Sequence, residues 1–87
     1  MLAVNGIIID VRSKHEFYSG NISKSINIPL HELPSNLSYL NDKKQPIIIC
    51  CASGIRSVIA SKILLVKGYT NVVNGGAWST LEKKLNN

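Results

Sequence analysis

Two adjacent cysteines followed by an arginine form the part of this sequence whose residue types best suit chemistry. Residues 47–59 read Ile-Ile-Ile-Cys-Cys-Ala-Ser-Gly-Ile-Arg-Ser-Val-Ile. Three consecutive isoleucines predict a strand buried on both faces, and a helical pattern begins at Ser57. We therefore expect Cys50 to Arg56 to form the turn between strand and helix, which places a cysteine where the strand ends.

A turn of this kind stabilises an anion. Its backbone N–H groups point inward, and the partly positive end of the next helix lies beside them. A thiolate is an anion, so this environment lowers the pKa of a cysteine below about 8.5 and makes the cysteine nucleophilic at neutral pH. Arg56 adds a permanent positive charge that suits an oxyanion. Alternation along a strand places Cys50 and Cys51 on opposite sides, and Cys50 suits a space-filling role.

Three motifs of the sequence together resemble one enzyme family. Residues 51–57 resemble the active-site loop of rhodaneses, sulfurtransferases that carry sulfur as a cysteine persulfide. Residues 9–12 (Ile-Asp-Val-Arg), 16–17 (Glu-Phe) and 20–22 (Gly-Asn-Ile) resemble the Asp-Val-Arg signature and the Gly-His-Ile of the family, with Asn21 in place of histidine. Residues 75–78 (Gly-Gly-Ala-Trp) resemble its C-terminal Gly-Gly-x-x-Trp. The resemblance covers about residues 6 to 82.

The resemblance implies a reaction and a set of residues. The Cys51 thiolate would attack the outer sulfur of thiosulfate or another sulfane donor, and the resulting persulfide would pass its sulfur to a thiol or cyanide. Arg56 would bind the oxyanion of the donor. No metal or organic cofactor is needed. The loop residues expected to hold the persulfide and the donor are Ala52, Ser53, Gly54, Ile55, Arg56 and Ser57.

Asp10 and Arg12 follow a second isoleucine-rich strand, so they lie at the sheet edge where open α/β sheets place their sites. They could border the pocket, but we favour a structural pair in which Arg12 binds Asp10 or Glu16 and fixes the loop. Gly75 and Gly76 are expected in a loop at the same edge, where they allow close approach of the backbone to the pocket or simply serve the turn.

Two other functions are compatible with these residues. Counted from Cys50, the sequence reads Cys-x5-Arg-Ser, the spacing of cysteine phosphatases, one group of which shares the rhodanese fold, and of some arsenate reductases. However, Ile49 stands where the phosphatase motif has histidine, and no aspartate follows at a general-acid position. The third reading is a non-catalytic rhodanese-like binding module, although idle members often lack the loop cysteine that is present here.

Strands that alternate with helices predict an α/β fold with a parallel sheet of about four strands and helices on both faces. The helix after the cysteine loop is apolar on most sides, so we expect it to be largely buried. Rhodanese domains usually begin with a further helix and strand, so this one is N-terminally short, and its less covered edge allows a monomer or a weak homodimer. We expect strands at 7–10, 25–28, 47–49 and 70–73, and helices at 13–19, 30–40, 57–67 and 77–85.

Length and composition fit one small domain, residues 1–87. The net charge of +5 comes from scattered lysines without interleaved aromatic residues, so it predicts a solvated surface rather than a nucleic-acid site. No apolar run reaches transmembrane length, and His15 and His31 have no ligand-spaced companions for a metal. Two free thiols suit a reducing compartment, so we expect a cytoplasmic protein, or an exported one if a leader has been removed.

Overall fold

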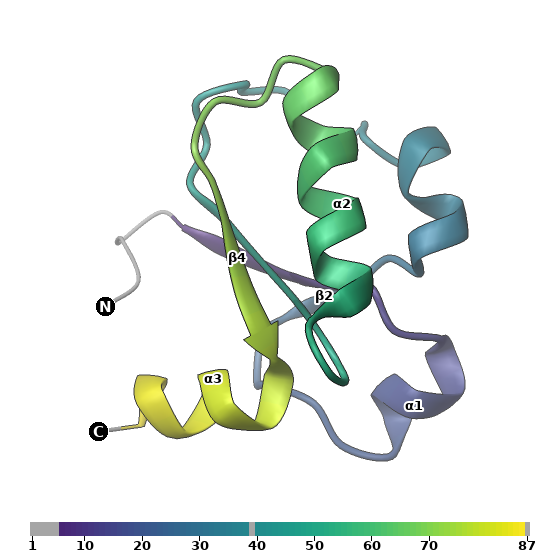
Figure 1. The fold of residues 1–87 in the computed structure, drawn as a ribbon, viewed down its shortest axis with the longest axis vertical. Coiled ribbons are helices and arrows are strands. Elements are labelled where there is room, and N and C mark those ends of the chain that lie inside the picture. The colour runs from purple at the N-terminus through teal and green to yellow at the C-terminus, as the bar shows by residue number, and fades with distance from the viewer. Residues whose placement is uncertain (1–5, 39, 87) are drawn as a thin grey trace.

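The computed structural model describes residues 6–38 and 40–86, and it has a four-stranded parallel sheet in the order β2-β1-β3-β4 (Figure 1). This confirms the predicted α/β class and the number of strands. The strands are β1 (Ile7–Asp10), β2 (Ile26–Asn27), β3 (Ile47–Cys51) and β4 (Val72–Ala77). The helices are α1 (Lys14–Tyr18), the 3-10 helix η1 (Leu30–Ser35), α2 (Ile55–Val66) and α3 (Trp78–Leu85).

The two faces of the sheet are covered by two separate apolar clusters. One cluster joins Ile9, Ile49 and Cys51 to buried side chains of η1 and α2. The other joins Ile8 and Cys50 to α3. Because side chains alternate along a strand, neighbouring residues of β3 enter different clusters. The prediction that the two cysteines lie on opposite sides is therefore confirmed.

The connection between β3 and α2 is shorter than the sequence suggests. The turn expected from Cys50 to Arg56 is wrong, since β3 includes both cysteines and α2 begins at Ile55. Cys50 and Cys51 pair with residues of β4, which keeps them in the sheet. Gly54 then turns the chain with a φ of 100°, a conformation that favours glycine.

The last strand also differs from its prediction. The sequence predicts a strand at 70–73 and a loop over residues 74–76, but β4 runs from Val72 to Ala77. Its pairing with β3 shifts register between Ile49 and Cys50. Glycine is rare in strands, so this segment looks like a turn in the sequence. Packing explains the exception, because a Cβ on Gly75 would lie 2.7 Å from Ile48 Cγ2 and 3.0 Å from the carbonyl oxygen of Ile49.

The leucine-rich segment forms a shorter helix than predicted. Helical spacing extends to Leu40, but η1 ends at Ser35. Pro34 lies inside η1 and has no N–H to donate, which favours a short helix. Leu33 and Leu40 are nevertheless buried in the first cluster, so the predicted role of this segment in the core is confirmed.

Helix α2 is much less buried than predicted. Its buried residues are Ser57, Ala60 and Leu64, which face the sheet. The opposite side remains exposed although it is apolar, because none of the described elements covers it; Val66 is 85% exposed. The predicted helix end is confirmed, since Gly68 has a φ of 98° and the next residue donates its N–H to the carbonyl of Leu64. None of the described helices is both long and apolar enough to cross a membrane.

A buried ion pair fixes the segment after β1. Arg12 Nε lies 3.0 Å from both carboxylate oxygens of Asp10, and Arg12 Nη2 lies 2.7 Å from Oδ2. The same guanidinium donates to the backbone carbonyls of Glu16 and Gly20, and it stacks 4.7 Å from the centre of the Trp78 ring. Arg12 therefore joins α1, the following turn and α3. Its pairing with Asp10 is one of the two pairings expected from the sequence.

Replacing Arg12 with methionine should lower the free energy of unfolding by about 3 kcal/mol, because the variant leaves the buried Asp10 carboxylate without its partner. Urea denaturation measures this change. The control is Lys14→Met, which removes an exposed cation nearby and should change stability by no more than about 0.5 kcal/mol. A loss below about 1 kcal/mol for Arg12→Met would show that the pair does not fix the fold.

Candidate active site

The thiol of Cys51 lies at the carboxyl end of β3, covered by the short loop of residues 52–54 and the first turn of α2. Its Sγ accepts the backbone N–H of Gly54 at 3.0 Å and the N–H of Ser57 at 3.4 Å. Both donors belong to the start of α2, where N–H groups have no partner within the helix. The loop and the helix dipole therefore direct positive partial charge at a single sulfur atom.

These contacts favour the thiolate form of Cys51. Burial alone would raise its pKa, since the charged form loses water. Hydrogen bonds from the hydroxyl and the N–H of Ser57 and from the N–H groups of Gly54 and Ser53 outweigh burial and lower the pKa of Cys51 below its ordinary value. The thiolate is the nucleophilic form of cysteine, and a lowered pKa increases its fraction near neutral pH.

Cys50 has the opposite environment. It is fully buried in the cluster against α3, and burial together with the nearby Asp10 charge raises the pKa of Cys50 to about 12. A thiol of this kind stays protonated at neutral pH and is chemically inert. Each cysteine lies in one of the two apolar clusters, but among the residues that the structure describes only Cys51 has N–H donors directed at its sulfur.

Asn74, a residue for which the sequence predicts no role, holds the start of α2 against β4. Its Oδ1 lies 2.6 Å from Ser57 Oγ and accepts the N–H of Gly76 at 2.9 Å. Ser57 Oγ also lies 2.8 Å from the carbonyl oxygen of Gly54, so this oxygen, Asn74 Oδ1 and Cys51 Sγ compete for its one proton. The sequence offers one signal for this role: Asn74 is an amide residue expected at the same sheet edge as the cysteine loop.

Arg56 is engaged by a residue forty positions away. Its two terminal nitrogens lie 2.7 and 2.9 Å from the carboxylate oxygens of Glu16. Glu16 also completes the capping box that the sequence predicts with Ser13 at the start of α1. The hydrogen bonds from Arg56, and then the backbone bond from Ser13, lower the pKa of Glu16 to about 2. The binding of a donor by Arg56 stays a prediction, and Glu16 competes for the same nitrogens.

The other predicted site residues fall into two groups. The loop residues surround Cys51, with Ala52 and Ser53 exposed. Gly76 lies beside the loop, since a Cβ on Gly54 would come within 3.7 Å of its Cα. In contrast, Gly75 packs against Ile48 and Leu81 under β4, and the side-chain bonds of Asp10 and Arg12 are directed at each other and at residues 16–20.

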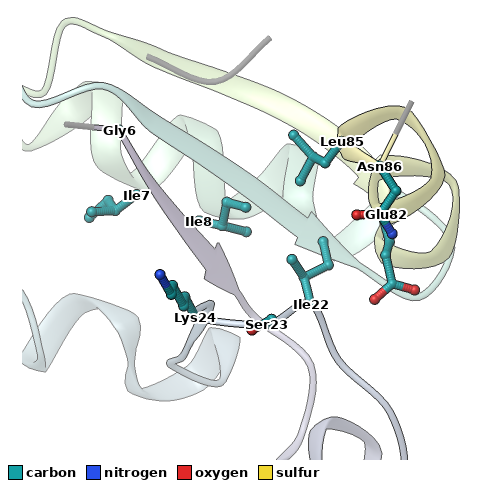
Figure 2. Close-up of a pocket in the computed structure, with 9 residues that line it drawn as sticks. All are labelled: Gly6, Ile7, Ile8, Ile22, Ser23, Lys24, Glu82, Leu85 and Asn86. Carbon is teal, nitrogen blue, oxygen red and sulfur yellow. The ribbon is translucent and has the colours of Figure 1, made fainter. Parts of the chain in front are cut away.

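Two hollows lie at opposite ends of the sheet. A hollow of about 330 Å³ opens beside Arg56 at the carboxyl ends of β1 and β2, lined also by Val11, Ser13, Pro29, Leu30 and His31. A second, of about 490 Å³, lies at the amino end of β1, where Ile8, Ile22 and Leu85 point towards its centre (Figure 2). Only the first adjoins a candidate site residue. Among the residues that the structure describes, no three His, Cys, Asp or Glu side chains gather as a metal site would require.

Comparison with known proteins gives a consistent result. The family model for the rhodanese-like domain matches residues 1–78. A rhodanese domain-containing protein of Drosophila melanogaster is 41% identical, over 88% of this chain and 82% of its own length. The thiosulfate sulfurtransferase GlpE of Stutzerimonas stutzeri is 32% identical, over 87% of this chain and 71% of its own length.

Solved structures show the same relationship. A rhodanese from Escherichia coli, determined with anions, superposes with a TM-score of 0.81 at 32% identity, covering 85% of this chain and 88% of that one. The similarity covers most of both chains rather than one short motif. The chain therefore belongs to the rhodanese-like domain family.

Proposed function

We propose that this protein is a sulfurtransferase that moves a sulfane sulfur through a persulfide on Cys51. The observation that carries the proposal is the set of N–H groups directed at Cys51 Sγ, which lowers the pKa of that thiol. Relatives that are named sulfurtransferases support it. The same donors that stabilise a thiolate would stabilise the terminal anion of a persulfide.

The proposed reaction needs only the cysteine, a donor and an acceptor. The Cys51 thiolate attacks the outer sulfur of thiosulfate, the sulfur–sulfur bond of the donor breaks, and sulfite leaves with the bonding electrons. The acceptor, a thiolate or cyanide, then attacks the outer sulfur of the persulfide and releases the Cys51 thiolate. Each step exchanges one sulfur–sulfur bond for a new bond to sulfur, so no external oxidant or reductant takes part.

The alternatives based on Cys50 have less support. A phosphatase or arsenate reductase would need Cys50 as a thiolate. Both cysteines are buried, but the pKa of Cys50, on the side of α3, is raised to about 12, whereas N–H groups are directed at Cys51 Sγ. A purely binding module would not require N–H groups aimed at a thiol. Sulfur transfer through Cys51 uses the N–H groups that are directed at its Sγ.

Incubation with thiosulfate should add one sulfur atom to the protein, measured as intact mass. The addition should persist in Cys50→Ser and disappear in Cys51→Ser. Both variants replace sulfur with oxygen at a buried position, so each serves as the structural control of the other. Absence of sulfur on wild type, or an addition that requires Cys50, would refute the proposed role of Cys51.

A second prediction concerns the competition between Glu16 and a donor for Arg56. Glu16→Gln keeps the capping box, because glutamine suits that position, and removes the charge that holds Arg56. We expect KM for thiosulfate to fall about two- to fivefold with kcat unchanged, the scale of one partly exposed ion pair. Because the pKa of Glu16 is about 2, its charge is constant above about pH 4, and the effect should not vary with pH there.

The matched control for this experiment is Glu32→Gln, which removes another partly exposed carboxylate and leaves Arg56 paired. Its KM for thiosulfate should remain within the error of wild type. A KM that is unchanged in Glu16→Gln, or that falls equally in Glu32→Gln, would show that Arg56 does not contribute to donor binding through this competition.

A further inference from the structure

The outward side of α2 carries an apolar surface that runs the length of the helix. Ile55, Val58, Ile59, Leu65 and Val66 are between 42% and 85% exposed. They lie on one side of the helix, opposite the buried Ala60 and Leu64, and Lys62 occupies the position between Ile59 and Val66 on that side. Exposed apolar side chains gathered on one side of a helix, here with Lys62 among them, are typical of an interaction surface, so this side of α2 is a candidate docking surface.

This surface includes a groove between α2 and η1. The groove has a volume of about 390 Å³ and lies between the proline of η1 and the C-terminal half of α2. Its lining residues are Pro34, Ile59, Lys62, Ile63, Val66 and Lys67. A lining of mainly apolar side chains with a few charged ones suits an amphipathic segment.

The charges of the groove identify the chemistry of its occupant. Lys62 and Lys67 are the only charged residues in the lining, and within the described part of the chain neither ammonium group has an acidic partner. A second copy docked through the same face would place these lysines against each other, and each copy carries a net charge of +5. An occupant with carboxylates beside its apolar side chains complements both features.

The apolar surface also begins at the candidate active site. Ile55 is 70% exposed and directly follows Gly54, whose N–H bonds to Cys51 Sγ. A segment that lies along α2 from the groove to Ile55 therefore ends beside the loop that covers Cys51. A small ion such as thiosulfate has no use for an apolar surface of this length, whereas a protein would.

We propose that the exposed side of α2 is the docking surface for a partner protein that carries an apolar segment flanked by carboxylates and exchanges sulfur with Cys51. The sulfur exchange rests on the proposed function, but the docking itself does not. The partner is bound by apolar contact along residues 55–66, and Lys62 and Lys67 set its charge.

Docking is tested by titrating isotopically labelled Cys51→Ser protein with a synthetic amphipathic helical peptide and following the amide signals by NMR. The peptide has one stripe of leucines flanked by glutamates, and its twin has lysines in place of the glutamates. We expect signal changes confined to α2, η1 and the loop beside Ile55. The lysine peptide should bind about tenfold more weakly, the effect of two lost ion pairs.

The variant Val66→Ser should weaken binding of the glutamate peptide about tenfold, since it removes one aliphatic contact. Its control is Val73→Ser, which makes the same substitution at another exposed position, on β4, and should leave binding within about twofold. Val66 and Val73 are 85% and 55% exposed, so neither substitution disturbs a core.

Equal binding of the two peptides, signal changes away from α2, or no effect of Val66→Ser would overturn the proposal. Concentration-dependent self-association that Val66→Ser abolishes would also overturn it, because the occupant would then be a second copy. Since Cys51→Ser cannot carry sulfur, these results are independent of the mass experiment. Failure of docking and failure of sulfur transfer are thus distinguishable.

Discussion

The backbone between β3 and α2 must turn within three residues, and this constraint organises the rest of the site. Gly54 makes the turn possible with a positive φ, and the first N–H groups of α2 then point back at the end of β3. The residue at that end is Cys51. The pairing of β3 with β4 and the contact of Asn74 with Ser57 hold both sides of the turn in place.

The electrostatics of the site result from two opposite arrangements. Around Cys51, hydrogen bonds from Ser57 and from the N–H groups of Gly54 and Ser53 stabilise the thiolate form. At the rim, the one arginine of the loop is bound by Glu16, which reduces the attraction of free anions. A donor that binds Arg56, as we propose, would have to displace the two carboxylate oxygens of Glu16 from the same guanidinium.

Much of this fold follows from the sequence because its signals are local. The isoleucine runs predict β1 and β3, alternation separates Cys50 from Cys51, and Ser13 with Glu16 predicts the start of α1. Contacts between distant residues have no local signal, so the pairing of Glu16 with Arg56 and the role of Asn74 emerge only in three dimensions. The glycines of β4 resemble a turn in the sequence but lie in a strand, where Gly75 packs too closely against Ile48 for a Cβ.

Helix α2 shows where a pattern alone misleads. Apolar residues on most sides of this helix predict burial, but the sheet and η1 cover one side only. The sequence of one chain does not reveal a surface that another molecule would cover. The same pattern thus carries functional information once the fold is known.

We infer that the fold lowers the pKa of Cys51 and raises that of Cys50. The most direct test is the pH dependence of thiolate ultraviolet absorbance in the Cys50→Ser and Cys51→Ser variants, each of which retains a single cysteine. The account predicts that Cys51 titrates with a pKa below the ordinary value of about 8.5 and that Cys50 remains protonated well above it. A Cys51 pKa at or above the ordinary value would contradict it.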